Sequence, residues 1–234
     1  MIKKYLSEVN STNTYAKEHI KNIKDKTVIY TSHQTGGRGR FNRVWVDLGD
    51  ENLFLSFVLK PSKDLKPVYS NLTQYTALKL AKTFEQYGVS PKIKWPNDIL
   101  IDGKKISGIL AESVMSEGIL KGLIIGVGLN LNANKEDFAQ IDKVVTALNL
   151  EIKKAVDKKI FLNKFCKNFF NDYENFLEHG FISIKSEYEY YANFIGKEVT
   201  IKNFSTTLKG IAEKITDEGA IVVDGQEFLT GDII

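Results

Sequence analysis

The sequence predicts an α+β fold, in which a mixed central sheet is flanked by helices and a small β-barrel follows. Two observations predict this class. Between residues 1 and 183, hairpins, strands and helical stretches are mixed instead of alternating as in doubly wound α/β proteins. From residue 184 onward the chain has mainly short apolar stretches separated by turn residues, as small barrels do. We therefore expect two domains, at residues 1–183 and 184–234.

The expected elements of the first domain begin with a helix. Ser11-Thr12-Asn13 is typical of a helix cap and predicts a helix to about Ile23. The Asp102-Gly103 pair between apolar stretches is a strong hairpin signal. The other expected elements are strands at 28–31, 53–59, 93–95, 99–101, 105–113 and 120–131, and helices at 67–87 and 161–178, closed by Gly88 and by Gly180.

The second domain is expected to contain only short strands. Turn residues at 217–219 (Asp-Glu-Gly) and 224–225 (Asp-Gly) separate the last of them. The expected strands are at 199–202, 207–215, 220–223 and 227–229.

The composition excludes several classes of protein. Of the 234 residues, 43% are hydrophobic and 26% are charged, as in ordinary soluble globular proteins. The net charge of +3 is a weak excess, and the lysines are spread among acidic residues, which argues against a nucleic-acid or membrane surface. The N-terminus lacks an apolar signal region, so we expect a cytoplasmic protein. The only cysteine is Cys166, and the histidines are too scattered to indicate a zinc site.

The most unusual segment is 35–45, Thr-Gly-Gly-Arg-Gly-Arg-Phe-Asn-Arg-Val-Trp. It contains every arginine of the chain, Arg38, Arg40 and Arg43, whereas lysine occupies the basic positions outside this segment. A planar guanidinium makes paired hydrogen bonds to phosphate or carboxylate. The interleaved glycines permit positive φ and bring backbone N–H groups close to an anion. The segment therefore indicates an oxyanion-binding loop, with a solvated basic loop as the alternative.

Two segments around the expected hairpin also combine unusual residues. In 94–98, Lys-Trp-Pro-Asn-Asp, a lysine interrupts an apolar strand and a carboxylate follows its end; 104–108, Lys-Lys-Ile-Ser-Gly, adds two more lysines. Beside an anion-binding loop, these residues suit phosphate and a metal ion. By themselves they are equally consistent with a strand ended by proline and solvated lysines at a turn.

The segment 126–132, Gly-Val-Gly-Leu-Asn-Leu-Asn, alternates glycine with apolar residues. Such a strand is one that a ligand or another backbone approaches closely, although tight packing alone would also explain it. The amide of Asn130 could contact a purine edge. The sequence has no Walker loop, no Ser/His/Asp triad, and no cysteines and histidines at the spacing of a zinc site. The residues themselves thus favour a phosphate-binding enzyme that does not use an ordinary P-loop.

Taken together, these segments closely resemble the biotin protein ligases. The likeness is carried, in the family's order, by Ser11-Thr12-Asn13, Gln34, residues 36–45, 94–98, 105–112 and 126–130. The resemblance implies a class II synthetase-like catalytic domain and a C-terminal SH3-like domain. It further implies an ATP-dependent biotin–[acetyl-CoA-carboxylase] ligase, which forms biotinyl-5′-AMP and transfers biotin to a lysine of a biotin carboxyl carrier domain.

The resemblance also implies roles for individual residues. Lys105, Arg40 and Lys94 would act in catalysis, and Asp98 is the expected partner of Mg²⁺. Biotin would be bound by Ser11, Thr12, Asn13, Gln34, Gly37, Arg38 and Lys105. ATP or the adenylate would be bound by Arg38, Arg40, Arg43, Trp45, Lys94, Asn97 and Asn130.

Two departures from the family pattern matter. Phe41-Asn42 stand where the family's loop commonly has a basic residue and glycine. Only ten residues precede Ser11, so we expect a monofunctional ligase without an N-terminal DNA-binding domain, which binds no DNA and no membrane and is a monomer or homodimer. Three alternatives remain at this point: a lipoate–protein ligase, a nucleotide- or biotin-binding module without catalysis, and a nucleic-acid-binding protein.

Overall fold

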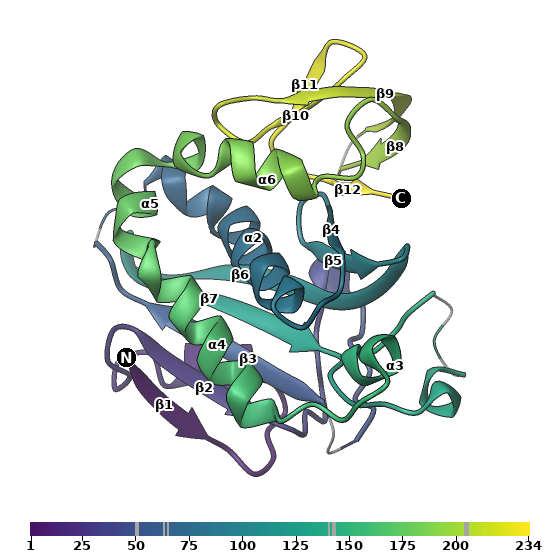
Figure 1. Ribbon diagram of the computed structural model, residues 1–234. Helices are drawn as coiled ribbons and strands as arrows, with labels where there is room; N and C mark the ends of the chain where they lie inside the picture. The colour runs from purple at the N-terminus through teal and green to yellow at the C-terminus, as the bar shows by residue number, and fades with distance from the viewer. Residues whose placement is uncertain (50–51, 63, 65, 140, 142–143, 204–205) are drawn as a thin grey trace. The chain divides into compact units, whose positions relative to one another are not determined.

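The computed structural model in Figure 1 describes residues 1–49, 52–62, 64, 66–139, 141, 144–203 and 206–234. These residues form two compact units. The first comprises Met1–Lys66 and Lys104–Phe161, and the second comprises Pro67–Gly103 and Leu162–Ile234. Both units combine strands with helices, which confirms the α+β class. The division into domains at residue 183 stays a prediction.

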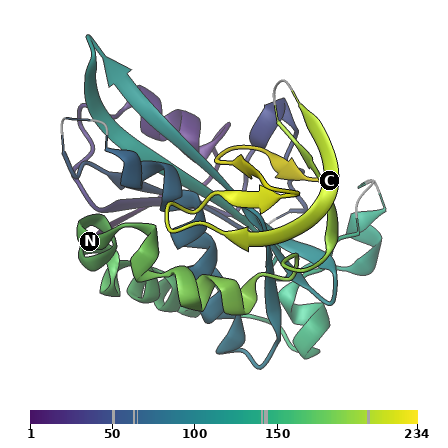
Figure 2. The same ribbon diagram turned by 90° about the horizontal axis from the view of Figure 1, so that it is seen from above.

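A mixed sheet forms the centre of the first unit, with its strands in the order β1-β2-β3-β7-β6. The pair β1–β2 is parallel and the others are antiparallel. The central strand β3 is buried along its whole length. Figure 2 shows the long β6–β7 hairpin in teal. The strands are β1 (Ile2–Tyr5), β2 (Thr27–Thr31), β3 (Leu53–Leu59), β6 (Lys104–Ser116) and β7 (Ile119–Leu129).

Helix α1 (Thr12–Glu18) covers one face of this sheet and contacts β2, β3 and β7. The helix is shorter than the sequence predicts, because the backbone turns after His19, whose carbonyl accepts the N–H groups of Asn22 and Ile23. Ile20 and Ile23 reach the core from this turn rather than from a helix. The core under α1 consists of Ala16, Ile20, Ile23, Ile29, Val58 and Ile124.

The rest of the first unit consists of short elements, several of which the sequence did not predict. Strand β1 was missed because its residues, Ile-Lys-Lys-Tyr, are all exposed and show no apolar alternation. The others are the 3₁₀ helices η1 (Arg40–Asn42) and η3 (Lys135–Phe138) and the helix α3 (Leu148–Ile152).

Helices dominate the second unit. The helix predicted at 67–87 is a 3₁₀ turn, η2 (Pro67–Asn71), followed by α2 (Leu72–Glu85). The helix predicted at 161–178 is divided at Asp172, whose carboxylate pairs with Lys79 of α2. The two pieces are α4 (Lys158–Asn171), most of which lies in this unit, and α5 (Tyr173–His179). Helix α5 ends at Gly180, as predicted. The short elements η4 (Phe181–Ser183) and α6 (Lys185–Tyr191) follow.

Two sets of strands complete the second unit. Strands β4 (Pro91–Lys94) and β5 (Asp98–Ile101) pair antiparallel around a cis Trp95–Pro96 peptide bond. Five short strands form a separate sheet in the order β11-β10-β9-β8-β12, drawn in yellow and green in Figure 2. They are β8 (Glu198–Lys202), β9 (Thr207–Ile215), β10 (Ile221–Val223), β11 (Gln226–Phe228) and β12 (Asp232–Ile233).

The expected sheet of short C-terminal strands is therefore present, but its pairing is open. Among the described residues β11 and β12 are its edges, so the order does not close into the predicted barrel. The turn before β10 anchors the sheet to the rest of the unit. The carbonyl of Gly219 accepts from Gln74 Nε2 at 2.8 Å and from Trp95 Nε1 at 3.4 Å. Trp95 is thus a buried structural residue.

Candidate active site

The N-terminus of α1 meets the end of β2 through Thr12 and Gln34. Gln34 Oε1 accepts the backbone N–H of Thr12 at 2.7 Å and lies 3.1 Å from Thr12 Oγ1. Both side chains are buried, as is that of Ser11, which stands at the N-cap position but makes no side-chain capping bond. Capping therefore does not account for the Ser11-Thr12-Asn13 segment. The side chains of Thr12 and Asn13 instead make hydrogen bonds within the first unit.

Asn13 sits on the sheet above Gly126 of β7. A Cβ atom at Gly126 would lie only 2.3 Å from Asn13 Oδ1, so the missing side chain makes room for the amide. The amide nitrogen donates to the Leu110 carbonyl at 3.2 Å and to Glu112 Oε2 at 2.8 Å. Ser56 Oγ is 2.6 Å from Asn13 Oδ1. The sequence predicted that a ligand or a backbone approaches this glycine, and a buried amide occupies that space.

The arginine-rich segment folds into an ordered loop. Its two sides are joined by a hydrogen bond from Trp45 N–H to the Gly37 carbonyl at 3.0 Å, and by another from Gly39 N–H to the Arg43 carbonyl at 2.8 Å. Arg38 Nη2 donates to Thr14 Oγ1 at 3.2 Å and lies 3.8 Å from Glu112 Oε1. Arg38, the first arginine of the loop, therefore contacts both α1 and β6.

Phe41 lies between the other two arginines. The guanidinium carbons of Arg40 and Arg43 lie 5.2 and 5.7 Å from the centre of its ring, within the range of cation–π attraction. Its φ of 53° is left-handed, an uncommon conformation for a bulky residue. Phe41, where the sequence departs from the family's loop pattern, therefore has a strained backbone conformation. Its ring lies next to both guanidinium groups.

Trp45 lies flat against the strands. Cβ atoms at Gly108 and Gly128, which are register partners on β6 and β7, would come within 2.6 and 2.5 Å of its ring. Lys105 Nζ lies 5.2 Å from the centre of the same ring. The structure therefore brings the predicted Trp45, Lys105 and glycine segments together on one face of the sheet.

Asn130 lies just beyond β7 and is buried. Its amide nitrogen donates to the Thr146 carbonyl at 3.1 Å, and its backbone N–H donates to the Ile106 carbonyl at 3.1 Å. The Thr146 N–H in turn donates to the Lys105 carbonyl at 2.9 Å. Lys105 and Asn130 are therefore held by the same loop segment around residue 146.

The remaining predicted residues belong to the second unit. Lys94 ends β4 and Asp98 begins β5, and the two are register partners across this hairpin. Asn97 lies in the turn between them, after the cis Trp95–Pro96 bond. Within this unit the segment 94–98 is thus a tight turn that holds a lysine opposite a carboxylate.

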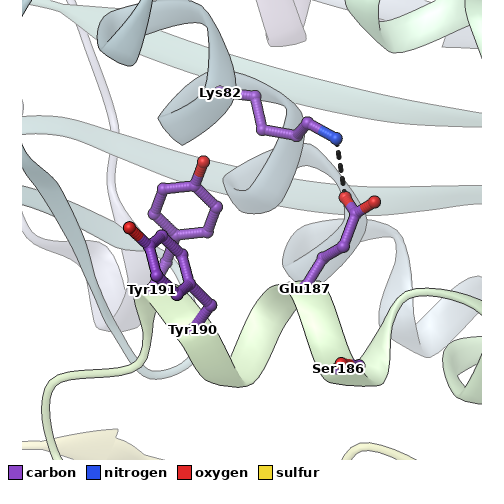
Figure 3. Close-up of a pocket in the computed structure, with 5 residues that line it drawn as sticks. All are labelled: Lys82, Ser186, Glu187, Tyr190 and Tyr191. Carbon is purple, nitrogen blue, oxygen red and sulfur yellow. Dashed lines mark hydrogen bonds and ion pairs between the residues drawn. The ribbon is translucent and has the colours of Figure 1, made fainter.

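Other features of the described residues mark no second active site. A pocket of about 320 Å³ in the second unit is lined by Lys82, Ser186, Glu187, Tyr190 and Tyr191, and none of them is a predicted site residue (Figure 3). An ion pair of 2.7 Å joins Lys82 to Glu187 there. In the part of the chain that the structure describes, no group of three or more His, Cys, Asp or Glu could hold a metal, and no helix is long and apolar enough to cross a membrane.

Comparison with known proteins identifies the family. Residues 5–130, more than half of the chain, match the model of the biotin/lipoate A/B protein ligase family. The chain belongs to this family. The matched region contains the residues of the site described in the first unit, together with the segment 94–98. Because the family includes ligases for both biotin and lipoate, individual relatives are needed to separate the two.

The relatives are named for biotin. A bifunctional ligase/repressor BirA of Bacillus spizizenii is 33% identical over 226 residues, which are 95% of this chain and 69% of that protein. A biotin–[acetyl-CoA-carboxylase] ligase of Paracoccus denitrificans is 29% identical, over 94% of this chain and 93% of that protein. A solved structure of the biotin protein ligase of Aquifex aeolicus in complex with biotin and ATP superposes with a TM-score of 0.84 at 28% identity, covering 100% of this chain and 97% of the other.

One residue of the network around Thr12 and Asn13, Ser56, is not among those that the sequence predicted. Ser56 lies at the middle of β3, and all the remaining residues of this strand are apolar. Its side chain is fully buried. Its hydroxyl contacts both Thr12 Oγ1 and Asn13 Oδ1. A serine within the stretch Leu-Phe-Leu-Ser-Phe-Val-Leu was a signal, because a buried hydroxyl needs a hydrogen-bond partner.

Proposed function

We propose that this protein is a biotin protein ligase. It activates biotin with ATP to biotinyl-5′-adenylate and pyrophosphate, and then transfers biotin to a lysine of a carrier domain of a biotin-dependent carboxylase. The observation that carries the proposal is the shared face of the first unit's sheet. There Asn13, the neighbour of Thr12 in the Thr12–Gln34 pair, packs on Gly126 of β7. Trp45, beside Lys105, packs on Gly108 of β6 and Gly128 of β7.

The biotin side of the site is formed by the α1 N-terminus and the start of the loop. Biotin has a neutral ureido head, which needs donors and acceptors at fixed positions rather than charge. The buried Thr12 and Gln34 provide both kinds of atom. The proposed biotin-binding residues are Ser11, Thr12, Asn13, Gln34, Gly37, Arg38 and Lys105.

The nucleotide side is formed by the rest of the loop and by Asn130. Arg40 and Arg43 grip phosphate oxygens with paired hydrogen bonds, and Trp45 stacks near the adenine. The bond from the Asn130 amide nitrogen to the Thr146 carbonyl orients the amide, and its oxygen accepts from the adenine amino group. The proposed ATP-binding residues are Arg38, Arg40, Arg43, Trp45, Lys94, Asn97 and Asn130.

The first chemical step brings two anions together. A carboxylate oxygen of biotin attacks the α-phosphorus of ATP, and the bond to the pyrophosphate leaving group breaks. Lys105, Arg40 and Lys94 cancel the repulsion between the carboxylate and the triphosphate, and they stabilise the charge that develops at phosphorus. In the second step the neutral ε-amine of the carrier lysine attacks the biotinyl carbonyl carbon, AMP leaves, and the amine loses a proton.

Asp98 is the residue that would hold Mg²⁺. Its carboxylate and the neighbouring Asn97 are oxygen donors of the kind that Mg²⁺ takes. Mg²⁺ at nucleotide sites is usually bound by one or two carboxylates, water and the substrate's phosphates, so a single carboxylate fits. When bound, the ion would neutralise charge on the triphosphate.

Several broader properties belong to the same proposal. The protein acts in the cytoplasm as a monomer or homodimer, with the carrier domain as its macromolecular partner. We also propose that the described catalytic unit binds no operator DNA itself, which agrees with the small net charge of +3. A sequence-specific footprint at physiological salt would contradict the last point.

The test is a biotin-dependent ATP–pyrophosphate exchange assay with the full chain. We expect exchange with biotin and none with lipoate, and we expect labelled biotin to appear on a carrier domain only when that domain is added. Exchange with lipoate instead would make the protein a lipoate–protein ligase. Biotin binding without exchange would make it a binding module and would contradict the proposal.

A further inference from the structure

The tip of the arginine-rich loop is a closed turn that brings two cations to one aromatic ring. The N–H of Arg43 donates to the Arg40 carbonyl at 3.1 Å, so these residues are the two ends of the turn, and Phe41 is its second residue. The guanidinium carbons of Arg40 and Arg43 lie 5.2 and 5.7 Å from the centre of the Phe41 ring. The ring is therefore close to both of the arginines that are proposed to grip the phosphates of ATP.

A phenylalanine at this position has a conformational cost. Its φ of 53° and ψ of 38° lie in the left-handed region, which glycine adopts freely and a bulky residue rarely does. The residue is 41% exposed, so burial of apolar surface is a weak reason for it. Strained residues persist where other interactions compensate, and they are common at ligand-binding sites. The attraction of two guanidinium groups to the ring is such a compensation.

The charges explain what the ring contributes before a nucleotide binds. Arg40 and Arg43 have the same charge, and they repel each other while no anion lies between them. The face of an aromatic ring is partly negative and attracts a cation within about 6 Å. A guanidinium attracted in this way keeps the N–H groups along its edge, which can still donate to phosphate oxygens. The ring and a phosphate can therefore bind the same guanidinium group at once.

Restraint of the arginines before binding matters for affinity. A long side chain that becomes ordered only on binding weakens the complex by roughly 2- to 12-fold. A side chain that is already held near its bound position loses less freedom. The stem of the loop is held separately, by the bond from Trp45 N–H to the Gly37 carbonyl and by that from Gly39 N–H to the Arg43 carbonyl. Loss of the ring should therefore affect the arginine side chains more than the path of the loop.

We propose that Phe41 is a positioning residue for ATP, whose ring holds the guanidinium groups of Arg40 and Arg43 ready for the phosphates before the nucleotide binds. This inference rests on the proposed function, in which these two arginines grip phosphate oxygens. Phe41 itself touches no substrate and acts through the arginines. The departure from the family's loop pattern at this position thus gives the chain an aromatic support for its phosphate-binding side chains.

The test removes the aromatic face and keeps the strained backbone. Phe41→Leu is apolar and has the same cost at positive φ, whereas Phe41→Tyr keeps the ring face. In biotin-dependent ATP–pyrophosphate exchange, Phe41→Leu should raise the KM for ATP about threefold to tenfold. Phe41→Tyr should keep the unaltered KM. The Kd for biotin, measured by titration calorimetry, should not change in either variant, because the biotin side of the site does not include Phe41.

The second unit offers a matched control. There Lys92 Nζ lies 5.3 Å from the centre of the Tyr190 ring, so Tyr190→Leu removes a contact of the same kind and should leave the KM for ATP unchanged. An unchanged KM in Phe41→Leu would overturn the inference. A lower KM would also overturn it, because the ring would then compete with ATP for the arginines. An equal rise in Phe41→Tyr and Phe41→Leu would assign the effect to side-chain shape and would contradict a role of the ring face.

A second experiment asks whether Phe41 acts through the arginines. In an Arg43→Ala background one of the two guanidinium groups is gone, so adding Phe41→Leu should change the KM for ATP by a smaller factor than it does in the unaltered protein. The same factor in both backgrounds would contradict a positioning role.

The loop also allows a measurement that needs no enzymatic activity. Arg38, Arg40 and Arg43 are the only arginines of the chain, so an arginine-specific protease cleaves the protein in this loop alone. A side chain held at the ring is less available to the protease. Cleavage after Arg40 and Arg43 should therefore be faster in Phe41→Leu than in Phe41→Tyr or the unaltered protein, each relative to a peptide of residues 35–45 with the same substitution.

Equal relative cleavage rates in the folded variants would overturn the inference, and thermal melts would check that each variant is folded. Failure of the proposed function would look different. The unaltered protein would then show no biotin-dependent exchange, while the cleavage rates would still report whether the ring holds the arginines.

Discussion

The indole of Trp45 packs directly on the backbone of Gly128, where a Cβ atom would lie 2.5 Å from Trp45 Cε2. Gly108, the partner of Gly128 on β6, has the same relationship to the ring at 2.6 Å. Register partners in an antiparallel pair project to the same face, so the two glycines form one flat surface. The ring on this surface lies beside the Lys105 ammonium.

The first prediction follows from this packing. Gly128→Ala should push the Trp45 ring off the sheet, because three ring atoms would lie only 2.5–2.9 Å from the new methyl group. We expect the KM for ATP to rise about tenfold, with a smaller effect on biotin. Steady-state exchange kinetics would measure both. Trp45→Phe combined with Gly128→Ala should recover part of the loss, and an unaltered KM for ATP in the single variant would contradict the packing argument.

Lys105→Ala should cripple adenylate formation and leave biotin binding within a few-fold. The proposed contact of Lys105 is with charge at the reacting centre, where stabilisation acts mainly on the transition state. Pyrophosphate exchange and biotin calorimetry on the same sample separate the two effects. Lys121→Ala on β7 serves as the control for loss of a lysine. Exchange close to the unaltered rate would remove Lys105 from the mechanism.

Lysine substitutions in the loop test whether ATP binding needs the planar guanidinium group of arginine or only its positive charge. Arg40→Lys and Arg43→Lys keep the charge, but each should weaken ATP use by ~1–3 kcal/mol because a charged hydrogen bond is lost. Arg38→Lys should instead affect biotin retention most, since Arg38 is tied to Thr14 and Glu112. The measurement is kcat/KM for each substrate. If all three variants keep the unaltered kinetics, positive charge alone suffices.

Biotin and ATP together should stabilise the fold more than the sum of their separate effects. The adenylate that forms occupies both subsites and binds only the native state, so its affinity adds to the free energy of unfolding. Thermal melts with each ligand, with both, and with a non-hydrolysable ATP analogue would measure this. Shifts that merely add, with no adenylate seen by mass spectrometry, would argue against a joined site.

Asp172→Asn should destabilise the protein by about 1–3 kcal/mol at pH 7, because it leaves the charge of Lys79 without its partner in a buried position. The Lys79 side chain is 4% exposed and that of Asp172 is 44% exposed, so part of the pair is screened by water. Chemical denaturation would measure the loss. Asp217→Asn, which breaks the more exposed pair with Lys185, should change stability little.

The same pair gives a pH dependence. The hydrogen bond from Lys79 lowers the pKa of the Asp172 carboxyl, against a smaller opposing effect of burial. Since the folded pKa lies below the unfolded value of about 3.9, the stabilisation is fully present above that value and is lost as the pH falls through the folded pKa. The difference between the unaltered protein and Asp172→Asn should therefore vanish in acid. A difference that persists there would exclude this cause.

Much of the fold could be read from local patterns. The strand at 53–59 was predicted with its observed bounds, because continuous apolar residues between turn signals leave little choice. The Asp102-Gly103 turn adopts positive φ at both residues, as the type I′ geometry requires. Helix ends were less predictable. The break at Asp172 accompanies a contact of its carboxylate with Lys79, which lies 93 residues away along the chain and is contained in no local pattern. The end of α1 at Glu18 comes instead from a turn at His19 that the residue pattern did not reveal.

The sequence by itself determined the family, the α+β class and the residue types of the site, because glycines, arginines and lysines at fixed spacings reflect chemistry that few other side chains can supply. Only the tertiary structure decided how those residues are used. The glycines at 108, 126 and 128 could have admitted a ligand or a backbone, and the fold gives their space to Trp45 and Asn13. Ser56, 43 residues from Asn13 along the chain, joins the site only because β3 pairs with β7. Hydrogen-bond direction depends on that three-dimensional neighbourhood, and the order of residues along the chain does not contain it.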